Sequence, residues 1–213
     1  MTNLLILETS AKDASLSALL AQEFADKVMH HDLINTITRR NLATTPLSNL
    51  DEAATQALRA GADEPTHAQQ EAMTMSDTLI AELEEADMVV IAAPMHNFTI
   101  SAQMRTWFDY VTRPGKSFGY GENGPQGLLS DKDVYVISTR GGQYGDGDAD
   151  APHPYDFQSG YLRHILGFIG LHSVQVIAAN GMDMGDEARK KGLADARAKT
   201  DELIKQHLAK HAA

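Results

Sequence analysis

The chain contains no cysteine, and this absence excludes several kinds of chemistry at once. Without a thiol there is no disulfide, no thiolate nucleophile, no redox-active cysteine pair and no cysteine metal ligand. Any redox function must therefore come from a bound cofactor. The nine histidines show no HExxH motif or other spacing typical of metal ligands, so we expect no metal site.

Positive charge is also scarce. Lysine and arginine together number 18 against 29 acidic residues, which gives a net charge of −11. Such a surface repels nucleic acid and anionic lipid, so we expect neither nucleic acid nor a membrane as a partner. The first apolar run, residues 4–7, is too short for a signal peptide or a membrane span, and we expect a cytoplasmic protein.

The apolar residues that are present suffice for one hydrophobic core. The chain has 213 residues, of which 43% are hydrophobic, and it shows no internal repeat, low-complexity tract or interdomain linker. One domain spanning residues 1–213 is the expected organisation.

Short apolar runs alternate with helical patterns along the chain. Continuous apolar runs are typical of strands buried on both faces of a parallel sheet, and they occur at residues 4–7, 88–93, 134–137 and 174–178, with a plausible further strand at 33–39. Helical spacing covers residues 15–30, 66–86, 101–112, 154–170 and 186–211. Thr66 and Gln69 fit a capping box. Residues 41–65, with two prolines and a glycine, look irregular.

This alternation predicts βαβ crossovers and therefore an α/β fold. We expect a flavodoxin-like three-layer sandwich, in which helices cover both faces of a five-stranded parallel sheet of order 2-1-3-4-5. In such sheets ligands bind outside the carboxyl ends of the strands, near the point where the strand order reverses. Three segments follow the relevant strands, namely residues 8–17, 94–98 and 138–145.

The first of these segments offers hydroxyls at the start of a predicted helix. Ser10, Ser15 and Ser17 could bind a phosphate there, because a helix N-terminus carries unpaired N–H groups and partial positive charge. Simple capping of the helix by Ser15 is the alternative.

The other two segments suit a flat ring. Asn97 and Phe98 follow a strand-ending proline, and a flavin needs such a combination of apolar surface and hydrogen-bond donors. A turn with Phe98 folded back into the core is equally compatible with the sequence. Gly141 and Gly142 can adopt positive φ and let N–H groups approach a ligand. A flexible turn is the alternative there.

Some local patterns imitate known motifs without the required context. Residues 119–124 match G-x-G-x-x-G but follow a predicted helix and precede none, so the dinucleotide-binding fingerprint is not met. Residues 115–117 resemble only the end of a P-loop, and the aspartates at 146, 148 and 150 lack the glycine and glutamate of a calcium loop.

Taken together, several stretches in order resemble one family, the bacterial FMN-dependent NADH-azoreductases, also described as quinone reductases. The stretches extend over nearly the whole chain, at residues 91–98, 107–109, 122–128, 139–142 and 166–170. The resemblance implies a flavodoxin-like fold and a homodimer with one FMN per subunit at the dimer interface.

The resemblance also assigns site residues. It implies FMN phosphate binding by Ser10, Ser15, Leu16 and Ser17. It implies contacts with the flavin ring by Pro94, Met95, His96, Asn97 and Phe98, and contacts with the polar edge of the ring by Thr139, Arg140, Gly141 and Gly142. Phe98, Tyr120 and Phe168 match positions that border the substrate pocket.

Two features depart from the family pattern. The first segment is one residue shorter than usual, and position 96 is histidine where the family usually has tyrosine. The histidine could donate a hydrogen bond to the flavin or the substrate. We favour the simpler interpretation, in which one planar side chain replaces another.

The implied activity is transfer of two electrons, as hydride, from NADH (or NADPH) to quinones and to azo compounds. The mechanism is ping-pong, the azo bond is cleaved after two rounds, and the flavin carries the chemistry, so no catalytic side chain is expected. A flavodoxin-like electron carrier acting with a protein partner is the main alternative, and a scaffold without flavin is a second. The segments 113–130 and 143–160 favour the enzyme, because they look like walls of a small-molecule pocket.

Overall fold

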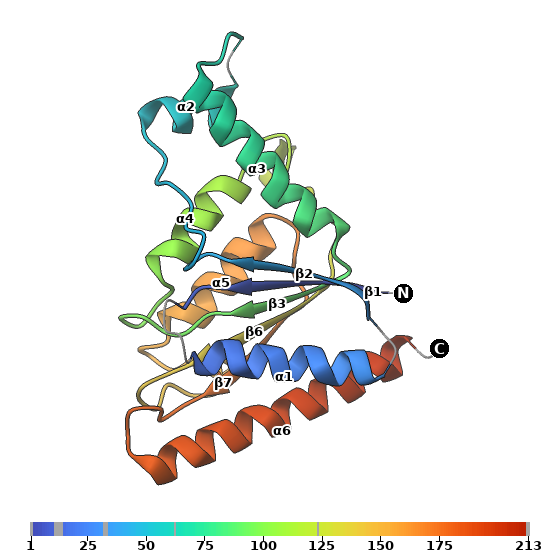
Figure 1. Cartoon of the computed structure of the whole chain (residues 1–213), viewed down its shortest axis with the longest axis vertical. Coiled ribbons are helices and arrows are strands. Elements are labelled where there is room, and N and C mark those ends of the chain that lie inside the picture. The colour runs from blue at the N-terminus through green and yellow to red at the C-terminus, as the bar shows by residue number, and fades with distance from the viewer. Residues whose placement is uncertain (1, 11–14, 32–33, 62, 123, 212–213) are drawn as a thin grey trace.

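A five-stranded parallel sheet in the order β2-β1-β3-β6-β7 forms the centre of the computed structural model (Figure 1). The structure describes residues 2–10, 15–31, 34–61, 63–122 and 124–211. Because β6 and β7 are the fourth and fifth strands of this sheet along the chain, the predicted order 2-1-3-4-5 is confirmed. The strands are β1 (Thr2–Glu8), β2 (Ile34–Asn41), β3 (Met88–Ala92), β6 (Asp133–Thr139) and β7 (Val174–Ala179).

Helices cover both faces of the sheet, as predicted. Figure 1 shows α1 and α6 on one face and α3, α4 and α5 on the other, with α2 beyond α3. The helices are α1 (Leu16–His30), α2 (Glu52–Ala60), α3 (His67–Glu85), α4 (Ala102–Val111), α5 (Phe157–Phe168) and α6 (Asp186–His211). No helix in the described part of the chain is long and apolar enough to cross a membrane.

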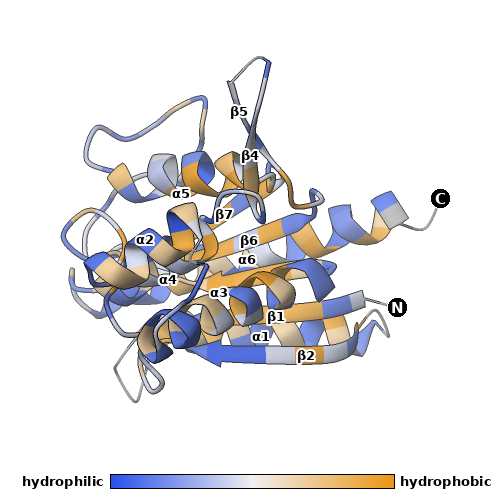
Figure 2. Ribbon diagram, turned by 90° about the horizontal axis from the view of Figure 1, so that it is seen from above, coloured by the Kyte–Doolittle hydropathy of each residue, from blue (hydrophilic) through white to orange (hydrophobic). Residues whose placement is uncertain are grey.

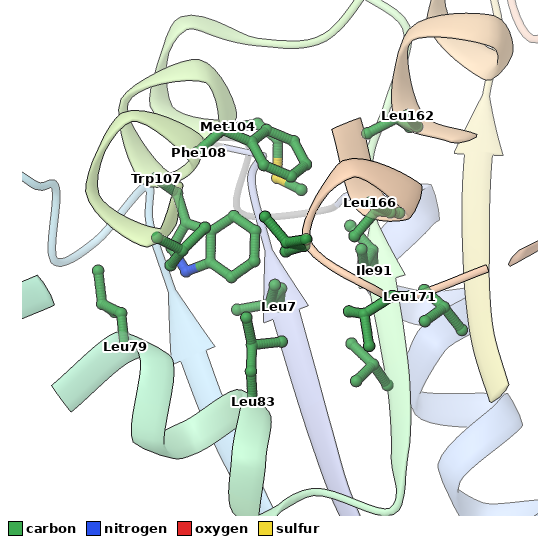
Figure 3. Packing of buried hydrophobic residues seen from close by; sticks show 14 of the residues in the cluster. Leu7, Leu79, Leu83, Ile91, Met104, Trp107, Phe108, Leu162, Leu166 and Leu171 are labelled. Atoms are coloured by element: carbon green, nitrogen blue, oxygen red, sulfur yellow. The ribbon is translucent and has the colours of Figure 1, made fainter. Parts of the chain in front are cut away.

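Each face of the sheet has its own hydrophobic cluster, because successive side chains of a strand point to opposite faces. Leu5 and Leu7 of β1 pack with α3, α4 and α5, where Trp107 is fully buried (Figure 3). Leu4 and Ile6 pack on the other face with α1 and α6. Strand β1 is therefore apolar on both sides, whereas the edge strand β2 is largely hydrophilic (Figure 2).

Most predicted elements are confirmed, including the capping box formed by Thr66 and Gln69. One helix was missed, and the start of another was placed too early. Residues 41–65 are not irregular throughout, because α2 forms there with Asp51 as its N-cap, whose Oδ1 accepts the N–H of Ala54 at 2.7 Å. The helix predicted from residue 154 begins only at Phe157, after the N-cap Asp156. Leu33, the first residue of the predicted second strand, lies outside the described residues.

A two-stranded hairpin, β4 (Phe118–Gly121) with β5 (Gly124–Gly127), projects from the α5 side of the sheet (Figure 2). It docks at the end of α5, where the N–H of Leu129 donates to the carbonyl of Ile169 at 3.1 Å. The approach at Gly127 is so close that a Cβ there would lie 2.1 Å from the nitrogen of Gly170. The sequence predicted a pocket wall in this region but not the hairpin.

Candidate functional site

The three segments predicted to bind a ligand lie at one edge of the sheet. Strand register places Glu8 opposite Ala92 and Ala92 opposite Ile137, so β1 and β3 end at the same level and β6 extends two residues further. Beyond the strands, the N–H of Thr9 donates to the carbonyl of Ala92 at 3.2 Å, and the N–H of Met95 donates to the carbonyl of Thr139 at 2.9 Å. Main-chain bonds therefore hold the three segments side by side.

The first segment ends in a capped helix. Ser15 is the N-cap of α1, and its Oγ accepts the N–H of Ala18 at 3.3 Å, which confirms the capping interpretation. The Oγ atoms of Ser15 and Ser17 lie 3.0 Å apart. One of these hydroxyls donates to the other, which leaves one hydroxyl proton of the pair to donate elsewhere, so capping and phosphate binding are compatible. Phosphate binding itself stays a prediction.

The other two residues of the predicted phosphate site, Leu16 and Ser10, differ in which of their groups a ligand could reach. The side chain of Leu16 packs against the hydrophobic cluster under α1, so only its main chain is available to a ligand. Ser10 is half-buried at the end of β1. Residues 11–14, between Ser10 and the helix, lie outside the described residues.

The second segment forms a tight reverse turn over residues 96–99. The N–H of His96 donates to the carbonyl of Thr99 and the N–H of Thr99 to the carbonyl of His96, both at 2.9 Å. Between them Asn97 has φ 47° and Phe98 has φ 70°, as in a type I′ turn. Left-handed backbone is unfavourable for a residue with a Cβ, by about 1–2 kcal/mol. Strain of this kind clusters at ligand-binding sites.

The turn presents both donors and apolar surface. Its two hydrogen bonds use the N–H groups of His96 and Thr99 and leave those of Asn97 and Phe98 for other partners. The side chain of Phe98 is 46% exposed, so it is not folded into the core. Its ring lies against Tyr144 and Tyr155, at centroid distances of 5.9 and 6.3 Å.

The third segment contains closely packed glycines. Neither Gly141 nor Gly142 adopts a positive φ, so that expectation was wrong. Space is limited at both positions, since a Cβ would lie 2.6 Å from Oδ2 of Asp183 at position 141 and 3.2 Å from the ring of Tyr144 at position 142, and either side chain would have to move. Tyr144, itself part of the third segment, thus links that segment to Phe98 of the second.

The guanidinium of Arg140 points into the protein. The residue is fully buried, so any contact with a cofactor must come from its main chain. Burial lowers the pKa of Arg140, against the opposite effect of the carboxylate of Asp156 at 2.9 Å. The guanidinium also donates to Oγ of Ser138 (3.0 Å), the carbonyls of Tyr144 and Gly145 (3.0 Å each) and Oγ of Ser159 (2.8 Å).

The residues predicted to border the substrate pocket fall into two aromatic groups. Phe118 joins Tyr120 and Phe168, at centroid distances of 5.7 and 4.6 Å, beside the β4–β5 hairpin. Phe98 belongs to the other group, with Tyr144 and Tyr155. Tyr120 is 78% exposed. In the described residues no ring contact connects the two groups.

The donor set fits a phosphorylated flat ring. Paired serine hydroxyls at the start of a 15-residue helix suit a phosphate. The turn supplies N–H groups for a polar ring edge, and the exposed ring of Phe98 supplies apolar surface. Within residues 2–211, apart from the gaps stated above, no three His, Asp or Glu side chains are grouped to hold a metal ion.

A family comparison agrees with this geometry. Residues 2–204 match the Flavodoxin_2 family, which is described as a flavodoxin-like fold. The chain belongs to this family. Among similar members, a Pseudomonas aeruginosa protein named FMN-dependent NADH:quinone oxidoreductase 3 is 42% identical over 201 residues, covering 92% of this chain and 90% of the relative. A Leptothrix cholodnii protein named FMN-dependent NADH:quinone oxidoreductase is 44% identical over 190 residues, covering 89% and 88%.

Solved structures confirm the fold. An azoreductase from Bacillus anthracis str. Sterne superposes with a TM-score of 0.81 at 24% identity, covering 95% of this chain and 98% of that one. An FMN-dependent NADH-azoreductase from Bacillus anthracis str. Ames Ancestor, solved in complex with FMN, gives 0.78 at 24% identity, covering 95% and 99%. The family match and the relatives at 42% and 44% identity confirm, at the level of the family, the resemblance deduced from the sequence.

Proposed function

We propose that this member of the flavodoxin-like family is an FMN-dependent oxidoreductase that transfers electrons from NADH to quinones and to azo compounds. The relatives named above, at 42% and 44% identity, support the quinone activity. The observation that carries the proposal is the strained turn at residues 96–99. The hydrogen bond from the N–H of Met95 to the carbonyl of Thr139 holds this turn beside the glycine segment 139–142.

In this proposal the chain binds and orients, and FMN when bound supplies the hydride exchange. The hydroxyls of Ser15 and Ser17 and the N-terminus of α1 bind the phosphate. The N–H groups of Asn97 and Phe98, which the two bonds of the turn do not use, and the main chain of residues 141–142 bind the polar edge of the ring. No side chain is asked to act as an acid or a nucleophile.

The proposed cycle is ping-pong. The exposed surface beside Phe98 takes NADH first and, after the nicotinamide has left, takes the acceptor in the same place. A quinone accepts two electrons and two protons and leaves as a hydroquinone, and an azo bond is cleaved after two such rounds. A single apolar wall favours this alternation, because both substrates are flat and use the same surface.

We also propose that the working unit is a homodimer. Several aromatic side chains near the site are exposed in one subunit, including Tyr120 at 78%, Tyr155 at 60% and Phe157 at 61%. Large exposed apolar groups that gather near a site are typical of contact surfaces. A second copy can bring the Tyr120 group of one subunit to the Phe98 group of the other. Sedimentation of the FMN-loaded protein tests this, and a monomer at working concentration contradicts it.

The decisive experiment is an anaerobic stopped-flow mix of FMN-loaded protein with NADH, repeated with NADPH, followed at the flavin absorption band. Bleaching by the nucleotide, and return of the colour on adding a quinone, would demonstrate both half-reactions. Bound FMN that neither nucleotide reduces would exclude the enzyme and favour the electron carrier.

A further inference from the structure

The first turn of α5 has one buried face, which lies next to two of the proposed ligand-binding segments. Gln158 in this turn is fully buried. Its Nε2 donates to the carbonyl of Ala93 at 2.9 Å, and its Oε1 accepts the hydroxyl of Ser138 at 2.5 Å. One amide side chain is therefore hydrogen-bonded to the ends of two neighbouring strands.

The two hydrogen-bond partners of Gln158 lie directly before two of the proposed ligand-binding segments. Ala93 is the residue directly before the segment 94–98, and Ser138 directly precedes the segment 139–142. Strand β3 ends at Ala92, so Ala93 lies just outside the sheet. The bridge through Gln158 adds a side-chain bond to the main-chain bond between Met95 and Thr139.

Neighbours on the same turn reinforce the bridge. The Nε of Arg140 donates to Oγ of Ser138 at 3.0 Å, and the Oγ of Ser159 donates to Oδ2 of Asp156 at 2.7 Å. Arg140 and Asp156 form a buried ion pair at 2.9 Å. A buried polar network of this kind stabilises one arrangement, because each group left without a partner carries a desolvation penalty.

We infer that Gln158 is a positioning residue for the cofactor, setting the distance between the 96–99 turn and the 139–142 segment without touching the flavin itself. The inference rests on the proposed function. Rigid support of contacting groups by side chains behind them is a general requirement of precise binding sites.

The variant Gln158→Met tests this, because methionine has a similar volume and makes neither hydrogen bond. We expect the dissociation constant of FMN from the apoprotein to rise about tenfold or more, since the carbonyl of Ala93 and the hydroxyl of Ser138 lose their partner. We also expect faster backbone amide exchange in residues 94–99 and 139–145 of the apoprotein, a readout that does not need FMN.

Ser76→Ala is the matched control. Ser76 is also fully buried, and its Oγ donates to the carbonyl of Tyr110 at 2.8 Å, between α3 and α4. This variant loses one buried hydrogen bond away from the site, so we expect lower stability with the FMN dissociation constant of the parent protein and unchanged exchange in residues 94–99.

Ser138→Ala removes one side of the bridge, together with the acceptor of the Arg140 Nε, and decides the matter if Gln158→Met does not fold. We expect severalfold weaker FMN binding in Ser138→Ala. Parent-like FMN binding in whichever of these variants folds, or equal losses in Ser76→Ala, would overturn the inference. A parent protein that binds no FMN would instead contradict the proposed function, which separates the two failures.

Discussion

The two ends of the parallel sheet differ in how their main-chain polar groups are satisfied. At the amino end, side chains of the protein satisfy the exposed main chain. Asp131 accepts the N–H groups of His172 and Ser173 at 2.8 and 3.0 Å, and its second oxygen accepts the hydroxyl of Ser173 at 2.8 Å. The ammonium of Lys132 donates to carbonyls at the C-terminus of α3, where the last turn lacks partners.

At the carboxyl end, the 96–99 turn leaves donors and an aromatic ring exposed and holds Asn97 and Phe98 in left-handed conformations. The amino end therefore contributes stability, whereas the carboxyl end keeps a shape ready for a ligand at some cost in stability. Departures from local rules are expected where a protein binds or reacts. Substitutions at the two ends should consequently separate stability from cofactor binding.

The largest effect is expected at the amino end, from Gly170→Ala. Gly170 has φ 108°, and a Cβ there would lie 2.3 Å from the carbonyl oxygen of Leu129. We expect the free energy of unfolding of the apoprotein to fall by about 3 kcal/mol, measured by denaturant titration. FMN affinity of the folded protein should not change.

Gly160→Ala, on an open face of α5, is the control for this substitution. A Cβ at Gly160 meets nothing within 4 Å, so alanine should raise stability by up to about 1 kcal/mol. A loss of FMN binding free energy in Gly170→Ala as large as its loss of unfolding free energy would contradict the assignment of stability to the amino end and cofactor binding to the carboxyl end.

At the carboxyl end, Asn97→Gly should leave stability nearly unchanged and weaken FMN binding. Glycine adopts the φ of 47° without steric penalty, so the free energy of unfolding should change by less than about 1 kcal/mol. The FMN dissociation constant, measured by fluorescence titration, should rise about tenfold because the amide side chain is lost. Unchanged FMN affinity would show that the amide side chain of Asn97 does not contribute, and would leave its main-chain N–H as the proposed contact.

Asp131→Asn tests the interactions at the amino end through the pH dependence of the free energy of unfolding. Burial alone would raise the pKa of Asp131, but hydrogen bonds from Ser173, His172 and Lys132 outweigh it and hold the pKa below its ordinary value. A lowered pKa means that the ionised carboxylate stabilises the fold above the ordinary pKa of about 4, and that this stabilisation is lost as the pH falls through the lowered value.

We therefore expect Asp131→Asn to be less stable than the parent by about 1 kcal/mol near neutral pH, with the difference shrinking below a pH of about 4. Denaturant unfolding at several pH values measures it. A difference that stays constant with pH would show that the charge of Asp131 is irrelevant.

The smallest effect is expected from His96→Tyr, which introduces the residue that the family resemblance implies at this position. His96 is exposed at the start of the turn, so stability should change by less than about 0.5 kcal/mol. The rate of flavin reduction by NADH should stay within about twofold of the parent. A rate several times lower would give His96 the hydrogen-bonding role that we disfavour.

The central strands could be predicted because they are continuous apolar runs buried on both faces, as in β1 and β3. Helix α2 was missed although its buried residues Ala54, Ala57 and Leu58 share one face at helical spacing, because the helix is only nine residues long and lies in a stretch bounded by prolines. Asp51 was an available signal for its start. The hairpin was also missed, because β4 and β5 are four-residue strands rich in glycine.

The site was located by topology, which places the ends of β1, β3 and β6 together. The side-chain hydrogen bonds that support the site could not be predicted from the sequence. Gln158 bonds to Ala93, 65 positions away, and no local pattern marks such a pair. The buried direction of the Arg140 side chain likewise depends on Asp156 and Ser159, whose role appears only once α5 is packed.

The 96–99 turn also restricts how this site can evolve. With positive φ at positions 97 and 98, a side chain branched at Cβ is a steric outlier, while asparagine, aspartate, histidine and glycine are tolerated. Valine, isoleucine and threonine are therefore poor choices at both positions, whatever ligand is selected for. Substrate preference can diversify there only among unbranched side chains, so larger changes in preference must arise in the hairpin or in the segment 143–156.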